Sequence, residues 1–261
     1  MPSDMPTDVE GLLELAVRAC RAAGEETRAF ARRGGWAVGT KSSPRDLVTD
    51  ADRASERALL EVITSARPDD AVQSEEGAAR DGSTGLTWVM DPLDGTTNFV
   101  YGRARWAVSV ACLDADGELV ACTYDVGADE TFTAARGRGA SLDGAPIRAG
   151  GAERLDRALV GTGFSPDLEI RLRQAVLVAR LVPLVLDLRR AGSPCLDLAD
   201  VACGRLDGFF EVLPGLWDRA AGMLLVREAG GAAVTTGPQR APQLVAAGPR
   251  LFEPLLRALE D

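Results

Sequence analysis

The sequence predicts a protein of the α/β class, more narrowly α+β, in which a lobe of helices and hairpins is joined to a lobe of alternating strands and helices. Three observations lead to this prediction. Residues 7–67 show helical spacing of apolar side chains with capping signals. Residues 88–147 contain short alternating apolar runs separated by turn sequences, and from about residue 155 strand-like and helix-like segments alternate. We expect lobes at 1–150 and 151–261 that form one compact unit, with a site in the cleft between them.

Two helices are predicted before the hairpin region. Thr7 and Glu10 fit a capping box for the first helix, which the glycines at 34 and 35 end. The second helix begins near Thr49 and ends before Pro68, because the residue before a proline is forced out of the helical region. The segments "DADG", "GADE" and "LDGAP" are hairpin signals, so residues 88–147 should form mostly antiparallel sheet.

The C-terminal part alternates between the two kinds of element. Strands are expected at 158–164, 185–190, 208–212 and 244–248. Helices are expected near 167–180, from Ser193-Pro194 onward, from Trp217 to about Gly230, and at the C-terminal end.

Charge and composition restrict the partners. The chain has 261 residues, with 29 basic and 39 acidic side chains and a net charge of −10, so its surface repels nucleic acids and anionic lipids. We therefore expect no direct nucleic-acid partner and no membrane association. The N-terminal sequence has no apolar signal segment, and the five cysteines form no CxxC pair, which favours a cytoplasmic protein.

The chain has no histidine. Nucleophile–histidine pairs and histidine-ligated zinc are therefore excluded. Any catalysis must use carboxylates, hydroxyls, lysine, arginine or metal ions.

Four carboxylates stand out. Asp91 ends an apolar strand and Asp94 follows it across Pro92, while Glu75 and Asp218 follow other apolar segments. Hard divalent cations such as Mg²⁺ prefer carboxylate and carbonyl oxygens, and a D-x-x-D turn offers two carboxylates and the Leu93 carbonyl. The Gly-Thr pair at 95–96 would then present N–H groups and a hydroxyl to a phosphate.

Taken one at a time, these residues have ordinary structural alternatives. Asp218 could be a helix N-cap, Asp52 a first-turn acid in a cap formed by Thr49, and Glu75 a solvated loop acid. Asp91 and Asp94 alone could form a polar turn. The sequence around these residues favours a shared metal-binding role for the four carboxylates.

Several long motifs carry that surrounding pattern. "DPLDGTTNF" (91–99) and "WDRAAGMLLVREAGG" (217–231) resemble the two signature motifs of the inositol monophosphatase family. The resemblance extends in register to residues 41–52, 74–77, 133–147 and 189–211. It implies a layered αβαβα sandwich with mixed or antiparallel sheets, usually a homodimer, and a magnesium-dependent, lithium-sensitive phosphomonoesterase.

The resemblance also assigns roles to residues by position. Two or three Mg²⁺ ions would be held by Glu75, Asp91, the Leu93 carbonyl, Asp94 and Asp218. Thr96, supported by Asp52, would orient and help to deprotonate the attacking water, with Glu75 completing the catalytic set. The expected substrate contacts are Gly95, Thr96, Ser193, Glu211 and Asp218, and Lys41 would lie near the metals.

The sequence departs from the family pattern near the expected substrate alcohol, whereas the expected metal ligands match it. Pro194 stands where the family usually has a small residue, and "VLPGL" (212–216) is uncharged. "DGTTNF" and the single acid Glu211 favour inositol 1-phosphate, since a carboxylate accepts from vicinal hydroxyls. Histidinol phosphate and other sugar or nucleotide phosphates are alternatives. A scaffold or regulatory binding protein that retains the fold is an alternative of another class.

Overall fold

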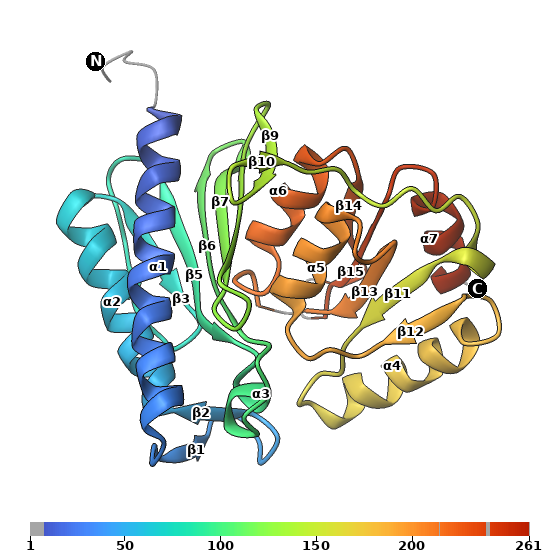
Figure 1. The fold of residues 1–261 in the computed structure, drawn as a ribbon, viewed down its shortest axis with the longest axis horizontal. Coiled ribbons are helices and arrows are strands. Elements are labelled where there is room, and N and C mark those ends of the chain that lie inside the picture. Colours follow the sequence, from blue (N-terminus) through green and yellow to red (C-terminus); the bar gives the residue numbers. More distant parts are fainter. Residues whose placement is uncertain (1–7, 214, 239–240, 261) are drawn as a thin grey trace.

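The computed structural model describes residues 8–213, 215–238 and 241–260 and shows five layers (Figure 1). Two N-terminal helices cover one face of an eight-stranded sheet, a second helix pair separates this sheet from a five-stranded sheet, and two further helices cover the far side. The predicted αβαβα sandwich with mixed and antiparallel sheets is confirmed. No helix in these ranges is long and apolar enough to span a lipid bilayer.

The first layer consists of α1 (Val9–Arg33) and α2 (Asp50–Ala66). The observed cap of α1 is Asp8, whose carboxylate accepts from the Gly11 N–H, while Thr7 lies outside the described residues. Gly34 ends α1 and Thr49 caps α2, as predicted. A short hairpin of β1 (Val38–Thr40) and β2 (Leu47–Thr49) lies between them, and its loop contains Lys41.

The eight-stranded sheet has the order β10-β9-β8-β7-β6-β5-β3-β4. Its strands are β3 (Ala71–Ser74), β4 (Ala79–Arg80), β5 (Thr87–Asp94), β6 (Ala107–Asp114), β7 (Gly117–Asp125), β8 (Glu130–Ala135), β9 (Gly139–Leu142) and β10 (Ala145–Pro146). The prediction of antiparallel sheet for 88–147 is confirmed, and the one parallel pair joins β3 to β5. The short helix α3 (Thr96–Val100) follows β5 directly.

The five-stranded sheet is mixed, with the order β12-β11-β13-β15-β14. Its strands are β11 (Leu159–Thr162), β12 (Asp187–Arg189), β13 (Gly208–Val212), β14 (Ala232–Thr236) and β15 (Gln243–Ala247). The accompanying helices are the 3₁₀ turn Leu155–Arg157, α4 (Leu168–Leu181), α5 (Pro194–Cys203), α6 (Ala220–Glu228) and α7 (Phe252–Glu260). Every strand and helix predicted for this region is present, and β14 is an addition.

Strand β5 is buried on both faces and therefore joins two cores. Trp88 and Met90 pack toward α1 and α2, whereas Val89 packs toward α5 and α6. The second of these cores contains residues from both predicted lobes, such as Phe132 and Phe209. Because β5 is held between two cores, its C-terminal end is a rigid platform for side chains.

Candidate functional site

The end of β5 brings two aspartates into the protein interior. Asp91 and Asp94 are 1% and 5% exposed, and the register of β5 against β6 shifts between them. Asp91 Oδ1 accepts a hydrogen bond from the Leu93 N–H at 3.1 Å, but its Oδ2 is buried without a hydrogen-bond partner in the described part of the chain. A buried carboxylate oxygen without a partner is costly, and a bound cation would remove that cost. The donor set therefore fits a hard divalent cation.

Asp94 is held from the other half of the chain. Its Oδ2 accepts from the Ser193 hydroxyl at 2.5 Å and from the Cys195 N–H at 2.8 Å, both at the start of α5. The possible ligand atoms of Asp91, Asp94 and Cys195 lie within 4.8 Å of one another. Burial and Asp94 raise the pKa of the Cys195 thiol, so Cys195 keeps its proton. A neutral thiol is a poor ligand for a hard cation, which leaves the two carboxylates.

Glu75 lies at the edge of this cluster and is paired with Lys41. The Lys41 ammonium lies 2.9 Å from a Glu75 carboxylate oxygen and 2.5 Å from one of Glu76. Burial lowers the pKa of Lys41, but the two glutamates outweigh it and the pKa is raised overall. Lys41 is the only lysine of the chain. Its ammonium partly balances the acidic cluster, and Glu76 is a neighbour that the sequence motifs did not single out.

Confinement of the carboxylates makes their ionisation costly. Burial, followed by the charges of Glu75 and Asp94, raises the pKa of both Asp91 and Asp218 well above the usual range. Burial raises the pKa of Asp94 to about 7 even though Ser193 and Cys195 donate hydrogen bonds to it. Adjacent like charges in a low-dielectric interior require a cation if all are to be ionised.

A second polar pair stands beside the aspartates. The Thr96 hydroxyl lies 3.0 Å from Asp52 Oδ1 and 3.2 Å from the Leu93 carbonyl oxygen. Asp52 Oδ2 accepts from the N–H and the hydroxyl of Thr49 at 2.8 and 2.5 Å, so the capping box of α2 also fixes the carboxylate that faces Thr96. Gly95 has a left-handed backbone with φ of 97°, and a Cβ there would lie 3.0 Å from the Arg105 carbonyl oxygen.

A cavity of about 400 Å³ lies beside these groups and is lined by residues from both halves of the chain. The residues predicted to bind metal or substrate that line it are Glu75, Asp94, Gly95, Thr96, Glu211 and Asp218. Glu211 comes from the end of β13 and is 7% exposed. Burial, then the charge of Asp197, raises its pKa to about 8, although Arg190 opposes this. A Cβ at Gly163 would overlap the Glu211 carboxylate, so this glycine makes room for it.

Three predicted residues need a separate description. Ser193 is fully buried, caps α5 and donates to Asp94, so it contacts a candidate ligand instead of lining the cavity. Asp218 precedes α6 by two residues and the N-cap is Arg219, so Asp218 is not the cap of that helix. Pro194 occupies the first turn of α5 and does line the cavity, whereas Pro214 lies outside the described residues.

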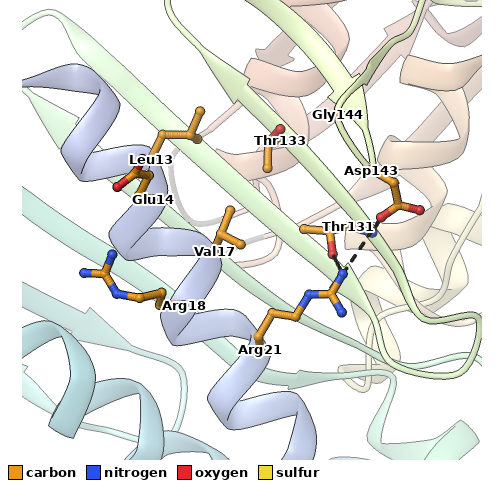
Figure 2. Close-up of a pocket in the computed structure, with 9 residues that line it drawn as sticks. All are labelled: Leu13, Glu14, Val17, Arg18, Arg21, Thr131, Thr133, Asp143 and Gly144. Carbon is orange, nitrogen blue, oxygen red and sulfur yellow. Dashed lines mark hydrogen bonds and ion pairs between the residues drawn. The ribbon is translucent and has the colours of Figure 1, made fainter.

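A larger hollow of about 700 Å³ lies elsewhere, between α1 and strand β8 (Figure 2). Leu13 and Val17 form an apolar side, and Arg21 extends across to Thr131, to which it donates at 2.6 Å. None of the clustered carboxylates reaches this hollow. The chemistry therefore belongs to the smaller cavity.

The five-layer sandwich with its acidic cavity is of the sugar-phosphatase type. The chain belongs to the inositol monophosphatase family, whose sequence model matches residues 8–260. Family membership implies a phosphatase.

Individual relatives agree with this assignment. The inositol-1-monophosphatase SuhB of Mycobacterium tuberculosis is 41% identical over 239 residues, covering 87% of this chain and 82% of the relative. The Nus factor SuhB of Escherichia coli is 38% identical over 256 residues and covers 96% of both chains. The crystal structure of extragenic suppressor protein suhB from Bartonella henselae superposes with a TM-score of 0.90 at 33% identity, over 96% of this chain and 99% of that chain.

Proposed function

We propose that the protein hydrolyses a phosphate monoester in a Mg²⁺-dependent reaction, with inositol 1-phosphate as the substrate. One observation carries this proposal: the buried, unpartnered oxygen of Asp91 lies in a cluster of carboxylates next to a cavity that contains the Thr96–Asp52 pair. Glu75, Asp91, Asp94, Asp218 and the Leu93 carbonyl would hold two or three Mg²⁺ ions. The ions would neutralise the phosphate and activate water for attack.

The chain's own residues would orient the reactants. Since the Thr96 hydroxyl can donate to Asp52, its oxygen remains free to accept from a water molecule, and a proton can pass through Thr96 toward Asp52. Burial raises the pKa of Asp52, although the bonds from Thr49 oppose this, which makes the carboxylate a better base. Gly95 and Thr96 would hold the phosphate.

The alcohol side supports a polyol. The Glu211 carboxyl group lines the cavity and can accept hydrogen bonds from substrate hydroxyls through its carbonyl oxygen. Arg45, Arg171 and Arg190 line the cavity together with the acids Asp46, Asp167 and Asp197, so the arginines would offset the attraction of these acids for the ammonium group of histidinol phosphate. The positive side chains therefore favour neutral or anionic alcohols.

The test is release of phosphate from a panel of phosphomonoesters with and without Mg²⁺. Activity should vanish in EDTA and return with Mg²⁺, and Asp94→Asn should lower kcat by about 10²-fold or more without unfolding the protein. Asp116→Asn, in an exposed turn, is the matched control. Near-normal turnover by Asp94→Asn at saturating Mg²⁺ would contradict the role of Asp94 as a metal ligand.

A regulatory or scaffold role is the second candidate, because some relatives are named Nus factor SuhB. The same panel separates the two candidates. Failure of the wild-type protein to release phosphate from any substrate, at any Mg²⁺ concentration, favours the regulatory role.

We also infer a cytoplasmic homodimer. None of the five cysteines forms a disulfide, which fits a reducing compartment. Leu168, Leu172 and Val176 are 55–61% exposed along one stripe of α4, which a second copy would cover. Leu172→Glu should convert the dimer to a monomer in light scattering, whereas Arg173→Gln should not. A wild-type monomer at micromolar concentration contradicts the inference.

A further inference from the structure

Helix α5 presents a carboxylate to the candidate cavity that the sequence motifs did not single out. Asp197 lies three residues after Pro194, which places both side chains on one face of the helix, and both line the cavity. Asp197 is only 2% exposed. From the sequence, Glu211 at the end of β13 is the one acid expected beside the substrate alcohol. A second buried charge there is costly unless other groups compensate for it.

Arg105 compensates for the charge of Asp197. Its Nη2 lies 2.7 Å from Asp197 Oδ1 and 2.8 Å from Asp200 Oδ2. The Arg105 backbone lies between α3 and β6 and is fixed, because its carbonyl accepts from Asn98 Nδ2 at 2.9 Å. Burial raises the pKa of Asp197 to about 6, although Arg105 opposes this, so Asp197 is mostly ionised at neutral pH. The ion pair therefore joins the two halves of the chain and holds an anionic carboxylate at the cavity.

The second oxygen of Asp197 is not used by the protein. Among the residues that the structure describes, no donor contacts Asp197 Oδ2, and because the side chain lines the cavity this oxygen is open to a ligand. After burial, the charge of Asp197 has the largest influence on the pKa of Glu211, so the two carboxyl groups are neighbours. The charge of Arg190 opposes the rise in the pKa of both, yet within the described residues Arg190 forms no ion pair with either. Two acidic groups from different elements thus lie close together at the cavity.

We propose that Asp197 is a substrate-binding residue that accepts a hydrogen bond from a hydroxyl of the alcohol, and that Arg105 is its positioning residue. This inference rests on the proposed function, which takes the phosphate to the carboxylate cluster and the alcohol to Glu211. An ionised carboxylate only accepts hydrogen bonds, so an alcohol without hydroxyls would leave the Asp197 charge unpaired. Two acidic groups on separate elements can bind two hydroxyls at once. The substrate class is therefore a polyol with at least two free hydroxyls beside the phosphate ester.

The first test compares two substrates in steady-state phosphate release with Mg²⁺. Inositol 1-phosphate carries ring hydroxyls, whereas phenyl phosphate has none. Asp197→Asn should raise KM for inositol 1-phosphate about 10-fold or more, the value of a hydrogen bond to a charged group, and should leave KM for phenyl phosphate unchanged. Because bound substrate and transition state share this contact, kcat should stay near the wild-type value. The matched control is Asp200→Asn, which should change neither KM, because Asp200 bonds to the same Arg105 nitrogen but does not line the cavity.

Arg105 is tested with the same two substrates. Arg105→Gln should raise KM for inositol 1-phosphate and not for phenyl phosphate, because Asp197 loses the group that orients it. Arg105→Lys keeps the positive charge and should restore part of the affinity. A merely structural role would alter both substrates alike, and thermal unfolding shows that each variant is folded.

A second test uses the wild-type protein and therefore does not depend on the folding of any variant. Single ring hydroxyls are removed from inositol 1-phosphate, and KM should rise about 10-fold at two positions, one bound by Glu211 and one by Asp197. In Asp197→Asn, the sensitivity at one of these positions should disappear.

An unchanged KM for inositol 1-phosphate in Asp197→Asn, an equal rise for both substrates, or the same rise in Asp200→Asn overturns the role of Asp197. Sensitivity of the wild-type protein to fewer than two hydroxyls overturns it as well. A raised KM in Asp197→Asn beside an unchanged KM in Arg105→Gln refutes the positioning role of Arg105 alone. Release of phosphate from neither substrate by the wild-type protein refutes the proposed function itself.

Discussion

Replacement of Glu211 by glutamine should stabilise the folded protein at alkaline pH and should weaken substrate binding. Glu211 is 7% exposed, and burial, with the charge of Asp197, raises its pKa from 4.5 to about 8. At about 1.4 kcal/mol per pKa unit, full ionisation of this carboxyl costs up to about 4–5 kcal/mol of folding free energy. The Glu211→Gln substitution keeps the size of the side chain and removes its charge.

The direction of the pH dependence follows from proton binding. In the unfolded chain the carboxyl loses its proton near pH 4.5, whereas in the folded protein it keeps the proton until about pH 8. Between these values the folded state binds more protons, so the free energy of unfolding falls as the pH rises. The stabilising effect of the raised pKa is complete below pH 4.5 and is lost as the pH passes 8.

Thermal unfolding in EDTA measures this effect without bound cations. Wild type and Glu211→Gln should unfold at similar temperatures at pH 4.5, and the variant should unfold roughly 5–10 °C higher at pH 8.5. The exposed Glu26→Gln is the control and should show no such divergence. A difference in Tm that does not change with pH would refute the reasoning, because the Glu211 carboxyl would then ionise as it does in the unfolded chain. With substrate, Glu211→Gln should raise KM for inositol 1-phosphate more than for glycerol 2-phosphate.

Three further outcomes are expected. Thr96→Ala should lower kcat by about 10²–10⁴-fold, because the proton path to Asp52 is lost, while calorimetry shows unchanged Mg²⁺ affinity; a parallel loss of Mg²⁺ binding would contradict this role. LiCl should inhibit phosphate release relative to NaCl at equal ionic strength, and identical initial rates would count against it. Gly24→Ala should destabilise the protein by about 1–3 kcal/mol in urea unfolding, because a Cβ would overlap the Tyr124 ring; an unchanged midpoint would show that the ring moves freely.

Local signals in the sequence predicted most of the fold. The caps at Thr49 and Gly34, the turn sequences between β5 and β10 and the start and stop residues of the helices after β11 each act within a few residues. Strand β14, with the sequence AAVTT, was missed because it is short and begins with two alanines, which have low strand propensity. Strand β1 was also missed, because its three exposed residues are too few to show an alternation of apolar and polar side chains.

The candidate site was predictable where its residues lie in continuous motifs. Asp91, Asp94 and Thr96 occur within six positions, and the family resemblance connected them to Glu75 and Asp218. Contacts between distant segments gave no such signal. Ser193 and Cys195 bind Asp94 across about a hundred residues of chain, and the candidate cavity is lined by residues from several separate segments. Folding, and not local propensity, brings these groups together.

The contact of Lys41 with Glu75 and Glu76 gives the acidic cluster a counter-ion that is part of the chain itself. If Glu75 serves as a metal ligand, loading the site is an ion exchange in which the ammonium must leave before the carboxylate is free. The departing amine is the only one on any side chain of this protein, since all its other basic side chains are arginines. The rate at which an amine-reactive reagent modifies Lys41 should therefore report whether its ammonium has been released from the glutamates, with no mutation required.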